Sequence, residues 1–317
     1  DLTDLGITFD GTNAGDFSIT SNPATTVVAG SSTTFTVQFA PTGAGARTAA
    51  LHIVNNLTNS KNPYDISLTG TATAPDINVE QPALTTIADG GTKDFGSVAV
   101  GGNTSLTFTI RNPGSASLTG LGITLDGTNA SEFSVTTNPT STVAVAGTTT
   151  FIMRFTPTSG GVRNATLNIA SNVIGNKNPY SIALTGTATT SDIAVEQPAL
   201  SGLADGGSKD FGSVAVGSNT SLTFTIRNTG GADLTGLTIT RDGTNSAEFT
   251  ITTNPATTVL PGALTTFVVR FAPTGTGNRS AALRISSNTP GAKNPFDINV
   301  NGIGAGPGLA EAAFNPA

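Results

Sequence analysis

The sequence repeats itself with a period of 116 residues. Residues 76–84 return at 192–200 with a single substitution, and residues 95–101 return unchanged at 211–217. Single positions keep the same spacing along the whole chain, among them Phe17, Phe133 and Phe249, Arg47, Arg163 and Arg279, and Gly70, Gly186 and Gly302. A regular internal period indicates tandem copies of one structural unit, so any fold for this chain must be built from one repeated domain.

The period divides the chain into four parts. We expect a partial repeat at residues 1–73, full repeats at 74–189 and 190–304, and a tail at 305–317. The first part aligns with the later portion of a full repeat and has no counterpart of residues 74–116.

Within a repeat, apolar residues recur at every second position. Leu106, Phe108 and Ile110 alternate with threonines and an arginine, and Phe151, Met153 and Phe155 follow the same rule. This period is typical of strands with one buried face, and Thr suits the pleated outer face. Turn residues such as Asp-Gly and Asn-Pro separate the strands, and no helical stripe is present. About seven strands per 116 residues predict an all-β fold of tandem immunoglobulin-like β-sandwiches.

Several short segments together carry a family resemblance. They are Phe-Gly-Ser-Val-Ala-Val-Gly at 95–101, Thr-Phe-Thr-Ile-Arg-Asn at 107–112, Leu-Thr-Gly-Leu at 118–121 and Phe-Ala-Pro-Thr at 39–42, most of which recur in other repeats. The combination resembles the Hydin/abnormal-spindle type of immunoglobulin-like repeat, as found in bacterial "choice-of-anchor D" surface proteins. The resemblance implies an extracellular, structural, array-forming role and supplies no catalytic residues.

Composition excludes several classes of function. Charged residues make up 11% of the chain, with 14 Lys and Arg against 20 Asp and Glu and no basic run, which gives no footprint for nucleic acid. No apolar stretch is long enough to span a membrane. The chain has no cysteine and a single histidine, His52, which leaves few ligands for a transition metal. We therefore expect no enzyme, no catalytic residue, no cofactor and no metal.

Most charged positions recur once per repeat, which favours a structural role over a single active site. His52 alternates with Leu51 and Ile53, so we interpret it as a solvated side chain on the outer strand face. The segments 126–129 and 89–91 carry too few carboxylates for calcium and are interpreted as turns. Three alternatives stay open: calcium between domains at Asp76, Glu80 or Asp192, isopeptide bonds from lysines to asparagines (Lys61, Lys93, Lys177, Lys209, Lys293), and glycans at Asn-x-Ser/Thr sites (Asn56, Asn103, Asn129, Asn164, Asn219, Asn278).

The partial repeat predicts an exposed apolar face, because strands equivalent to Ile77–Val79, Phe95–Val100 and Leu106–Ile110 are missing from it. Either the chain is a segment of a longer array, or a neighbouring subunit supplies the strands. The tail has only Leu309, Ala312, Ala313 and Phe314 as apolar anchors and lacks strand alternation, so it is a poor donor of three strands.

These observations predict a structural building block of an extracellular fibre, filament or cell-surface stalk that associates with itself. The alternative is an adhesin or carbohydrate-binding stalk, for which exposed aromatic side chains at Tyr64, Tyr180 or Phe296 would supply a glycan contact. Recurrence of these three positions in register favours packing. A third hypothesis, a cytoskeletal scaffold, fits poorly with the low charge and the absence of cysteine.

Overall fold

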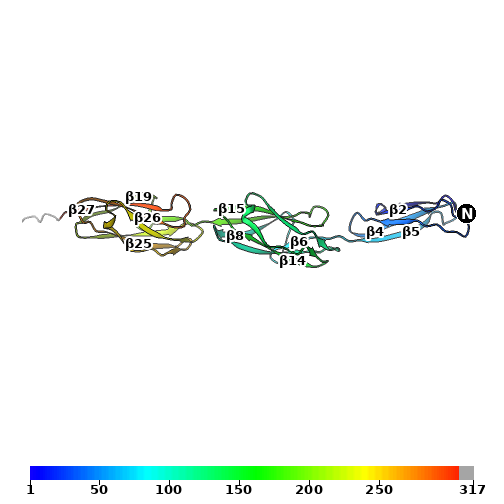
Figure 1. The fold of residues 1–317 in the computed structure, drawn as a ribbon, viewed down its shortest axis with the longest axis horizontal. Coiled ribbons are helices and arrows are strands. Elements are labelled where there is room, and N and C mark those ends of the chain that lie inside the picture. Colours follow the sequence, from blue (N-terminus) through cyan, green and yellow to red (C-terminus); the bar gives the residue numbers. More distant parts are fainter. Residues whose placement is uncertain (307–317) are drawn as a thin grey trace, which may run out of the picture.

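A computed structural model describes residues 1–306. Three β-sandwich units follow one another along a single line, joined by short linkers (Figure 1). Regular structure consists of strands and three short 3-10 helices, in agreement with the predicted all-β fold. None of the helices among these residues has the length and apolar character needed to cross a membrane.

The first repeat contains five strands and one 3-10 helix: β1 (Gly6–Asp10), η1 (Ala14–Asp16), β2 (Phe17–Ser21), β3 (Thr36–Phe39), β4 (Gly45–Val54) and β5 (Tyr64–Ala72). One sheet has the order β1-β4-β5, and the other consists of β2 and β3. Alternate apolar residues on β3, β4 and β5 point between the two sheets, as the period of two predicts.

The second repeat is complete and has five strands before the counterpart of β1. Its elements are β6 (Asn78–Glu80), β7 (Thr86–Ile87), β8 (Gly91–Ala99), β9 (Thr104–Arg111), β10 (Leu118–Thr119), β11 (Gly122–Asp126), η2 (Ala130–Glu132), β12 (Phe133–Thr137), β13 (Thr142–Val143), β14 (Thr148–Phe155), β15 (Gly161–Ala170) and β16 (Tyr180–Thr189). The two sheets of the sandwich have the orders β11-β15-β16-β8 and β12-β14-β9-β6-β7.

The third repeat has the same topology. Its elements are β17 (Ile193–Glu196), β18 (Gly202–Leu203), β19 (Gly207–Ala215), β20 (Thr220–Asn228), β21 (Leu234–Thr235), β22 (Thr238–Asp242), η3 (Ser246–Glu248), β23 (Phe249–Thr253), β24 (Thr258–Val259), β25 (Leu264–Phe271), β26 (Gly277–Ser286) and β27 (Phe296–Ala305). Because β27 ends at Ala305, the last repeat includes one residue that the expected boundary at 304 assigned to the tail. The apolar tail residues Leu309 to Phe314 lie outside the described part of the chain.

Strand content differs from the expected seven in two respects. The two-residue strands β7, β10 and β13 carry too little sequence to show alternation. Strand β8 begins at Gly91, in a polar stretch before the predicted strand at Phe95, and pairs in parallel with β16. Each complete repeat therefore closes one sheet with an early strand lying beside its last strand.

Each complete repeat has its own hydrophobic core. In the second repeat the core includes Ile77, Phe108, Phe151 and Leu184, none of which is exposed. The third repeat has an equivalent core around Ile193, Phe224, Phe267 and Val300. Stacked phenylalanines join neighbouring strands within each core, because aromatic pairs on adjacent strands gain contact in addition to burial.

Candidate functional site: the open face of the first repeat

Each repeat contains a buried carboxylate that fixes a loop at one end of the sandwich. In the second repeat, Glu132 accepts hydrogen bonds from the backbone and hydroxyl groups of Thr158 and faces Arg163 at 3.4 Å. Burial alone would raise the pKa of Glu132, but those hydrogen bonds and the nearby guanidinium lower it overall. Equivalent sets are Asp16, Thr42 and Arg47 in the first repeat and Glu248, Thr274 and Arg279 in the third. These recurring charges position loops of the fold.

His52 is not a free surface side chain, which corrects the sequence-based interpretation. Its Nδ1 lies 2.7 Å from Asp65 on the neighbouring strand β5, and its Nε2 lies 3.1 Å from Asp10 on β1. Hydrogen bonds to Asp65 and Asp10 raise the pKa of His52. The three-residue cluster spans the sheet β1-β4-β5.

The other repeats carry the same cross-strand cluster with different chemistry. In the third repeat Arg284 joins Asp242 at 2.6 Å and Asp297 at 2.9 Å. In the second repeat Asn168 donates to Asp126 and accepts from the hydroxyl of Ser181. The residue at position 52 and its counterparts therefore connect three neighbouring strands. Both outer strands supply a carboxylate where the central residue is His or Arg, and one of them supplies a serine where it is Asn.

The loop between β6 and β7 presents an exposed leucine on a constrained backbone. Leu84 has a φ of 69°, unusual for a residue with a side chain, and is 82% exposed. Glu80 holds this loop, because one carboxylate oxygen accepts from the amide of Leu84 at 2.9 Å and the other from Arg111 at 2.8 Å. The third repeat repeats this arrangement with Glu196, Arg227 and Leu200.

Most of the other candidate carboxylates and lysines contact protein groups. Asp76 pairs with Lys177 and Asp192 with Lys293, each at 2.8 Å and partly exposed, so these lysines contact carboxylates and not asparagine side chains. Lys93 and Lys209 donate to backbone carbonyls. Asp89 and Asp126 accept hydrogen bonds from neighbouring strands. Across residues 1–306, no group of three or more His, Asp or Glu side chains is arranged to hold a metal ion.

A buried asparagine fixes the loop that follows strand β9 or β20 in each complete repeat. The sequence analysis did not single it out. Asn112 is fully buried; its side-chain amide donates to Ala116 and Val143, and its oxygen accepts from Gly114. Asn228 makes equivalent bonds in the third repeat. The sequence pattern that could have identified this residue is the recurrence of Asn after Thr-Ile-Arg in both complete repeats.

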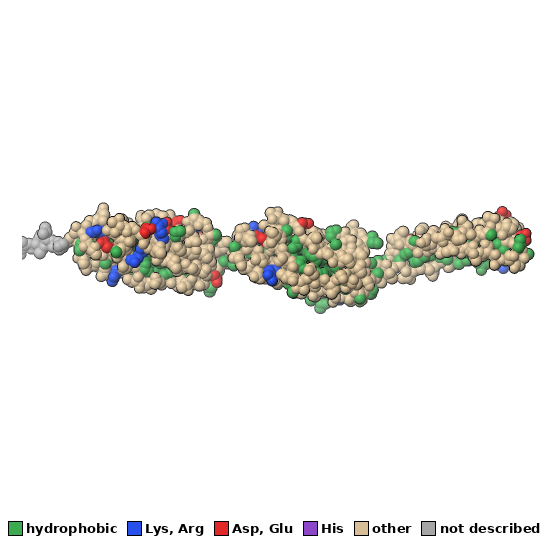
Figure 2. All heavy atoms as spheres, in the orientation of Figure 1, with side chains coloured by type: hydrophobic (Ala, Val, Ile, Leu, Met, Phe, Trp, Pro, Cys, Tyr) green, Lys and Arg blue, Asp and Glu red, His purple; other side chains and the backbone are tan. Residues whose placement is uncertain are grey.

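The first repeat exposes the face that other strands cover in the complete repeats. Phe35, Val37 and Phe39 are half-buried, whereas their counterparts Phe151, Met153 and Phe155 have no exposed surface. Apolar side chains follow one side of the first repeat in Figure 2. A cavity of about 290 Å³ adjoins Phe35 and is lined by Leu2, Leu5, Val27 and Ile53 among others.

The aromatic residues after Asn-Pro show the same contrast. Tyr180 and Phe296 are each 2% exposed, so packing, favoured by their recurrence, is confirmed for both. Tyr180 donates a hydrogen bond to the carbonyl of Ile87, which lies on a strand that the first repeat lacks. Tyr64 is consequently 52% exposed.

Comparison with known families identifies the repeat type. Residues 206–302 match the HYDIN/CFA65/VesB-like immunoglobulin-like domain, and residues 84–178 match the ASH domain (abnormal spindle-like microcephaly-associated, ASPM-SPD-2-Hydin). The two complete repeats are Hydin-type immunoglobulin-like domains. Comparison with curated proteins gave no match.

Solved structures resemble the Hydin-type repeats only at low sequence identity. The ASH/PapD-like domain 7 of human CEP192 is 13% identical, with 36% of this chain and 86% of that chain covered and a TM-score of 0.24. Secreted serine protease VesC from Vibrio cholerae is 13% identical, with 62% and 49% covered and a TM-score of 0.26. The C-terminal domain of Streptococcus pyogenes AspA is 11% identical, with 73% and 99% covered and a TM-score of 0.30.

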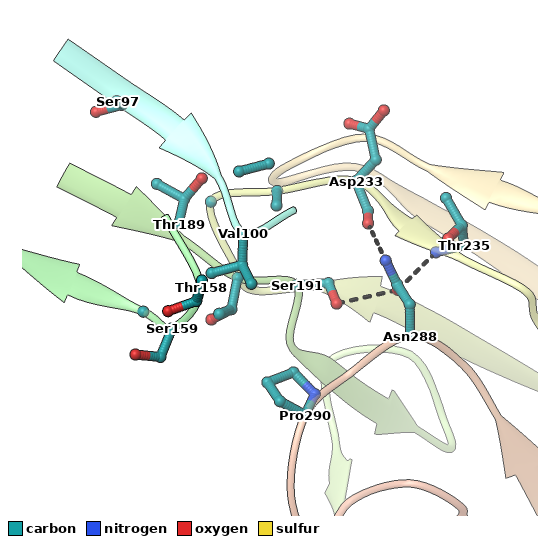
Figure 3. A pocket seen from close by; sticks show the side chains of 15 residues that line it. Ser97, Val100, Thr158, Ser159, Thr189, Ser191, Asp233, Thr235, Asn288 and Pro290 are labelled. Atoms are coloured by element: carbon teal, nitrogen blue, oxygen red, sulfur yellow. Dashed lines mark hydrogen bonds between the residues drawn. The ribbon is translucent and has the colours of Figure 1, made fainter. Parts of the chain in front are cut away.

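A groove of about 690 Å³ lies between the two Hydin-type repeats (Figure 3). Ser97, Val100 and Thr158 line it from the second repeat, and Asp233, Asn288 and Pro290 from the third. Asn288 fixes the third-repeat side by bonding Ser191, Thr235 and the carbonyl of Asp233. Its lining contains one ionised side chain, Asp233, and no aromatic ring, which gives little basis for tight binding of a sugar or an ion.

The potential glycan acceptors are mostly accessible on the Hydin-type repeats and on the first repeat. Five are exposed: Asn56, Asn103, Asn164, Asn219 and Asn278. Asn129 is half-buried, and its side-chain oxygen accepts from the amide of Asn164. Use of these sites stays a prediction.

Proposed function

We propose that this chain is a structural building block of an extracellular fibre, filament or cell-surface stalk. The observation that carries the proposal is the end-to-end arrangement of the three units, whose long strands lie along the common axis (Figure 1). In this arrangement each additional repeat lengthens the rod by the same amount.

The linkers support a rod of limited flexibility. The carbonyl of Thr190 accepts from the amides of Gly231 and Ala232, and the carbonyl of Ala74 accepts from those of Ser115 and Ala116. Both linkers are therefore bound to the repeat that follows them. A linker with its backbone groups bonded has less conformational freedom than a free chain of equal length.

Glycines make these linker contacts sterically possible. A methyl group at Gly230 would come within 2.4 Å of the Asp192 amide, and one at Gly114 within 2.4 Å of the Asp76 amide. Only glycine allows the loop to approach the linker this closely. Recurrence of this contact at both junctions supports a regular array.

Surface chemistry agrees with a structural role outside the cell. Few charged side chains interrupt the surface in Figure 2, and the chain contains no cysteine. Several of these charges pair with one another, such as Arg284 with Asp242 and Asp297. A surface of this kind presents few groups that oxidise or titrate.

Electron microscopy of native material at the surface of its source cell tests the proposal. We expect filaments or stalks with an axial repeat that corresponds to one immunoglobulin-like unit. Small-angle X-ray scattering of the purified chain should give the profile of a thin rod. Compact or freely jointed particles would contradict it.

The alternative function, an adhesin or glycan-binding stalk, draws on a single observation. Tyr64 is the one large aromatic side chain of residues 1–306 with more than half of its surface exposed. Isolated short rods in microscopy, together with a glycan-array signal that Tyr64→Ala removes, would favour this alternative over a fibre.

A further inference from the structure

We propose that the side of the second repeat formed by the edge strands β11 and β12 binds the same side of a second copy of this chain, with the two β12 strands antiparallel about a two-fold axis at Val135. This inference rests on the proposed structural function, to which it adds a lateral contact between rods. Three features support it: free backbone groups on β12, an apolar strip beside them, and the absence of charge along the strand.

The backbone of β12 is bonded to a neighbouring strand on one side only. Within residues 1–306, β12 pairs with β14 and with no other strand. The amide of Thr156 donates to the carbonyl of Glu132 at 2.8 Å. Because bonded positions alternate along an antiparallel pair, Ser134 also bonds toward β14, and the amide and carbonyl of Val135 point away from it. A strand edge of this kind can bond an incoming strand.

The third repeat has a cap on this edge that the second repeat lacks. Arg241 on β22 donates from Nη1 to the carbonyl of Phe249, the first residue of β23, at 2.6 Å. The carbonyl at this position therefore points outward, as the alternation requires. The counterpart of Arg241 in the second repeat is Leu125 on β11, whose side chain has no donor. The edge that the third repeat covers with a guanidinium thus stays open in the second.

Apolar side chains flank the open edge. Ile123 and Leu125 on β11 and Val135 on β12 pack against the core and remain partly exposed. In the third repeat this strip is interrupted by Arg241, which is exposed. A two-fold axis at Val135 places the strip of one copy beside the strip of the other. A second copy of the chain therefore offers apolar surface where apolar surface needs to be covered, on both sides of the contact.

The edge carries no charge that would oppose a second copy. Strand β12 reads Phe-Ser-Val-Thr-Thr and contains neither a charged residue nor proline. By contrast, the edge strand β8 contains Lys93 and Asp94, and charged residues discourage pairing between sheet edges. The second repeat as a whole, residues 74–189, has six carboxylates and five Lys or Arg side chains. Two copies of this repeat side by side therefore meet little net repulsion.

The free backbone groups specify the register. Val135 of each chain donates its amide to the carbonyl of the other Val135, as in a hydrogen-bonded antiparallel pair. The same register puts Ser134 opposite Thr136 of the second copy, and hydroxyl side chains pair favourably across strands. A bulge between Val135 and Thr137 limits the pairing to a few residues. We therefore expect a weak, reversible dimer in which two five-stranded sheets join edge to edge.

Sedimentation of the full chain over a range of concentrations tests the proposal. We expect a reversible equilibrium between monomer and dimer. Hydrogen exchange at low and high chain concentration locates the contact. The amide of Val135 should exchange at least about threefold more slowly at the higher concentration. The amide of Ser134 should not change, because it is already bonded to β14.

Matched proline variants separate edge pairing from non-specific association. Val135→Pro removes the donor at the open edge and should raise the dissociation constant of the dimer at least about tenfold. Ile251→Pro makes the same change at the equivalent position of β23 and should leave the dissociation constant unchanged. Thermal unfolding of both variants checks that each repeat still folds.

Exchange of the capping residue provides a second test that leaves β12 unaltered. Leu125→Arg copies the third repeat and should also weaken the dimer at least about tenfold. Arg241→Leu copies the second repeat, opens the edge of β23 and should strengthen association.

A chain that stays monomeric up to about 1 mM would overturn the proposal. So would equal effects of Val135→Pro and Ile251→Pro, or concentration-dependent protection that leaves out Val135. A monomer that still scatters as a thin rod would remove the lateral contact and leave the proposed structural function in place, so the two failures are distinguishable.

Discussion

The ring of Phe155 lies directly against Gly186 in the facing sheet, so that a methyl group on Gly186 would come within 2.5 Å of the Phe155 Cε1 atom. Gly186→Ala should therefore destabilise the second repeat by about 1–3 kcal/mol, the usual cost of overpacking. Urea denaturation measures this change. Gly122→Ala is the matched control, because a methyl group there meets no atom within 4 Å; equal effects of the two variants would argue against the packing seen here.

The same substitution in the first repeat should have a smaller effect. Gly70 contacts Phe39 as closely as Gly186 contacts Phe155, but Phe39 is half-buried and Phe155 is not exposed. Phe39 can move toward solvent to relieve the clash. We expect Gly70→Ala to cost less than half as much as Gly186→Ala, measured by hydrogen exchange resolved by repeat.

Loss of the Asn112 side chain should destabilise the second repeat more than loss of most other polar side chains. It has no exposed surface and bonds both the Gly114 loop and the carbonyls of Ala116 and Val143. Asn112→Ala leaves several buried groups unpaired and should cost about 2–4 kcal/mol. Asn103→Ala, on an exposed turn, should change stability little. Thermal unfolding compares the two; similar melting temperatures would contradict the role assigned to Asn112.

His52 should make stability of the first repeat depend on pH. Hydrogen bonds to Asp65 and Asp10 raise the pKa of His52 in the folded state. Its stabilising contribution is then fully present below about pH 6.5, the unfolded value, and disappears as the pH rises through the folded pKa.

A nuclear magnetic resonance titration measures this pKa without assignment, because His52 is the single histidine of the chain. A midpoint at or below about 6.5 would contradict the cluster. His52→Asn, which copies the second repeat, should remove the pH dependence of the stability. His52→Arg, which copies the third repeat, should keep the contacts with Asp10 and Asp65 at all pH values near neutral.

Glu80 should control exchange of the Leu84 amide. Glu80→Gln removes the charge that pairs with Arg111 and weakens acceptance from Leu84, so we expect that amide to exchange about tenfold faster. Glu196→Gln is the matched control, since it should affect Leu200 and leave Leu84 unchanged.

The contact between the Glu80 carboxylate and the loop at Leu84 should weaken in acid. The hydrogen bond from Arg111 lowers the pKa of Glu80 below its usual value near 4.5. Stabilisation of the loop is therefore present above about pH 4.5 and is lost as the pH falls through the folded pKa. Retained protection of Leu84 well below that range would contradict the assigned contact.

Local sequence patterns predicted much of the sandwich. Alternation identified β9 and β14 because most residues on their inner faces are large and apolar, and repetition at 116 residues identified the units. The beginning of β8 was missed because Gly91 to Asp94 is a polar stretch, and its position depends on parallel pairing with β16, more than 80 residues away along the chain.

The candidate site was predictable only in part. Missing strands in the first repeat showed that an apolar face would be exposed, but the location of the recess beside Phe35 needed the packing of Leu2 and Val27. His52 was misjudged because its partners Asp10 and Asp65 lie on two different strands, and register alone brings them together. Cross-strand chemistry of this kind is invisible to a one-dimensional pattern.

Parallel pairing of β8 with β16 has a consequence for how a repeat bears mechanical load. Tension applied through the linkers leaves the second repeat through β16, which is bonded along its length to β15 on one edge and to β8 on the other. Those bonds are sheared together instead of being opened one at a time. The last strand of the third repeat, β27, is bonded in the same way to β26 on one edge and in parallel to β19 on the other, so under a pulling force we expect both complete repeats to resist extension by shear.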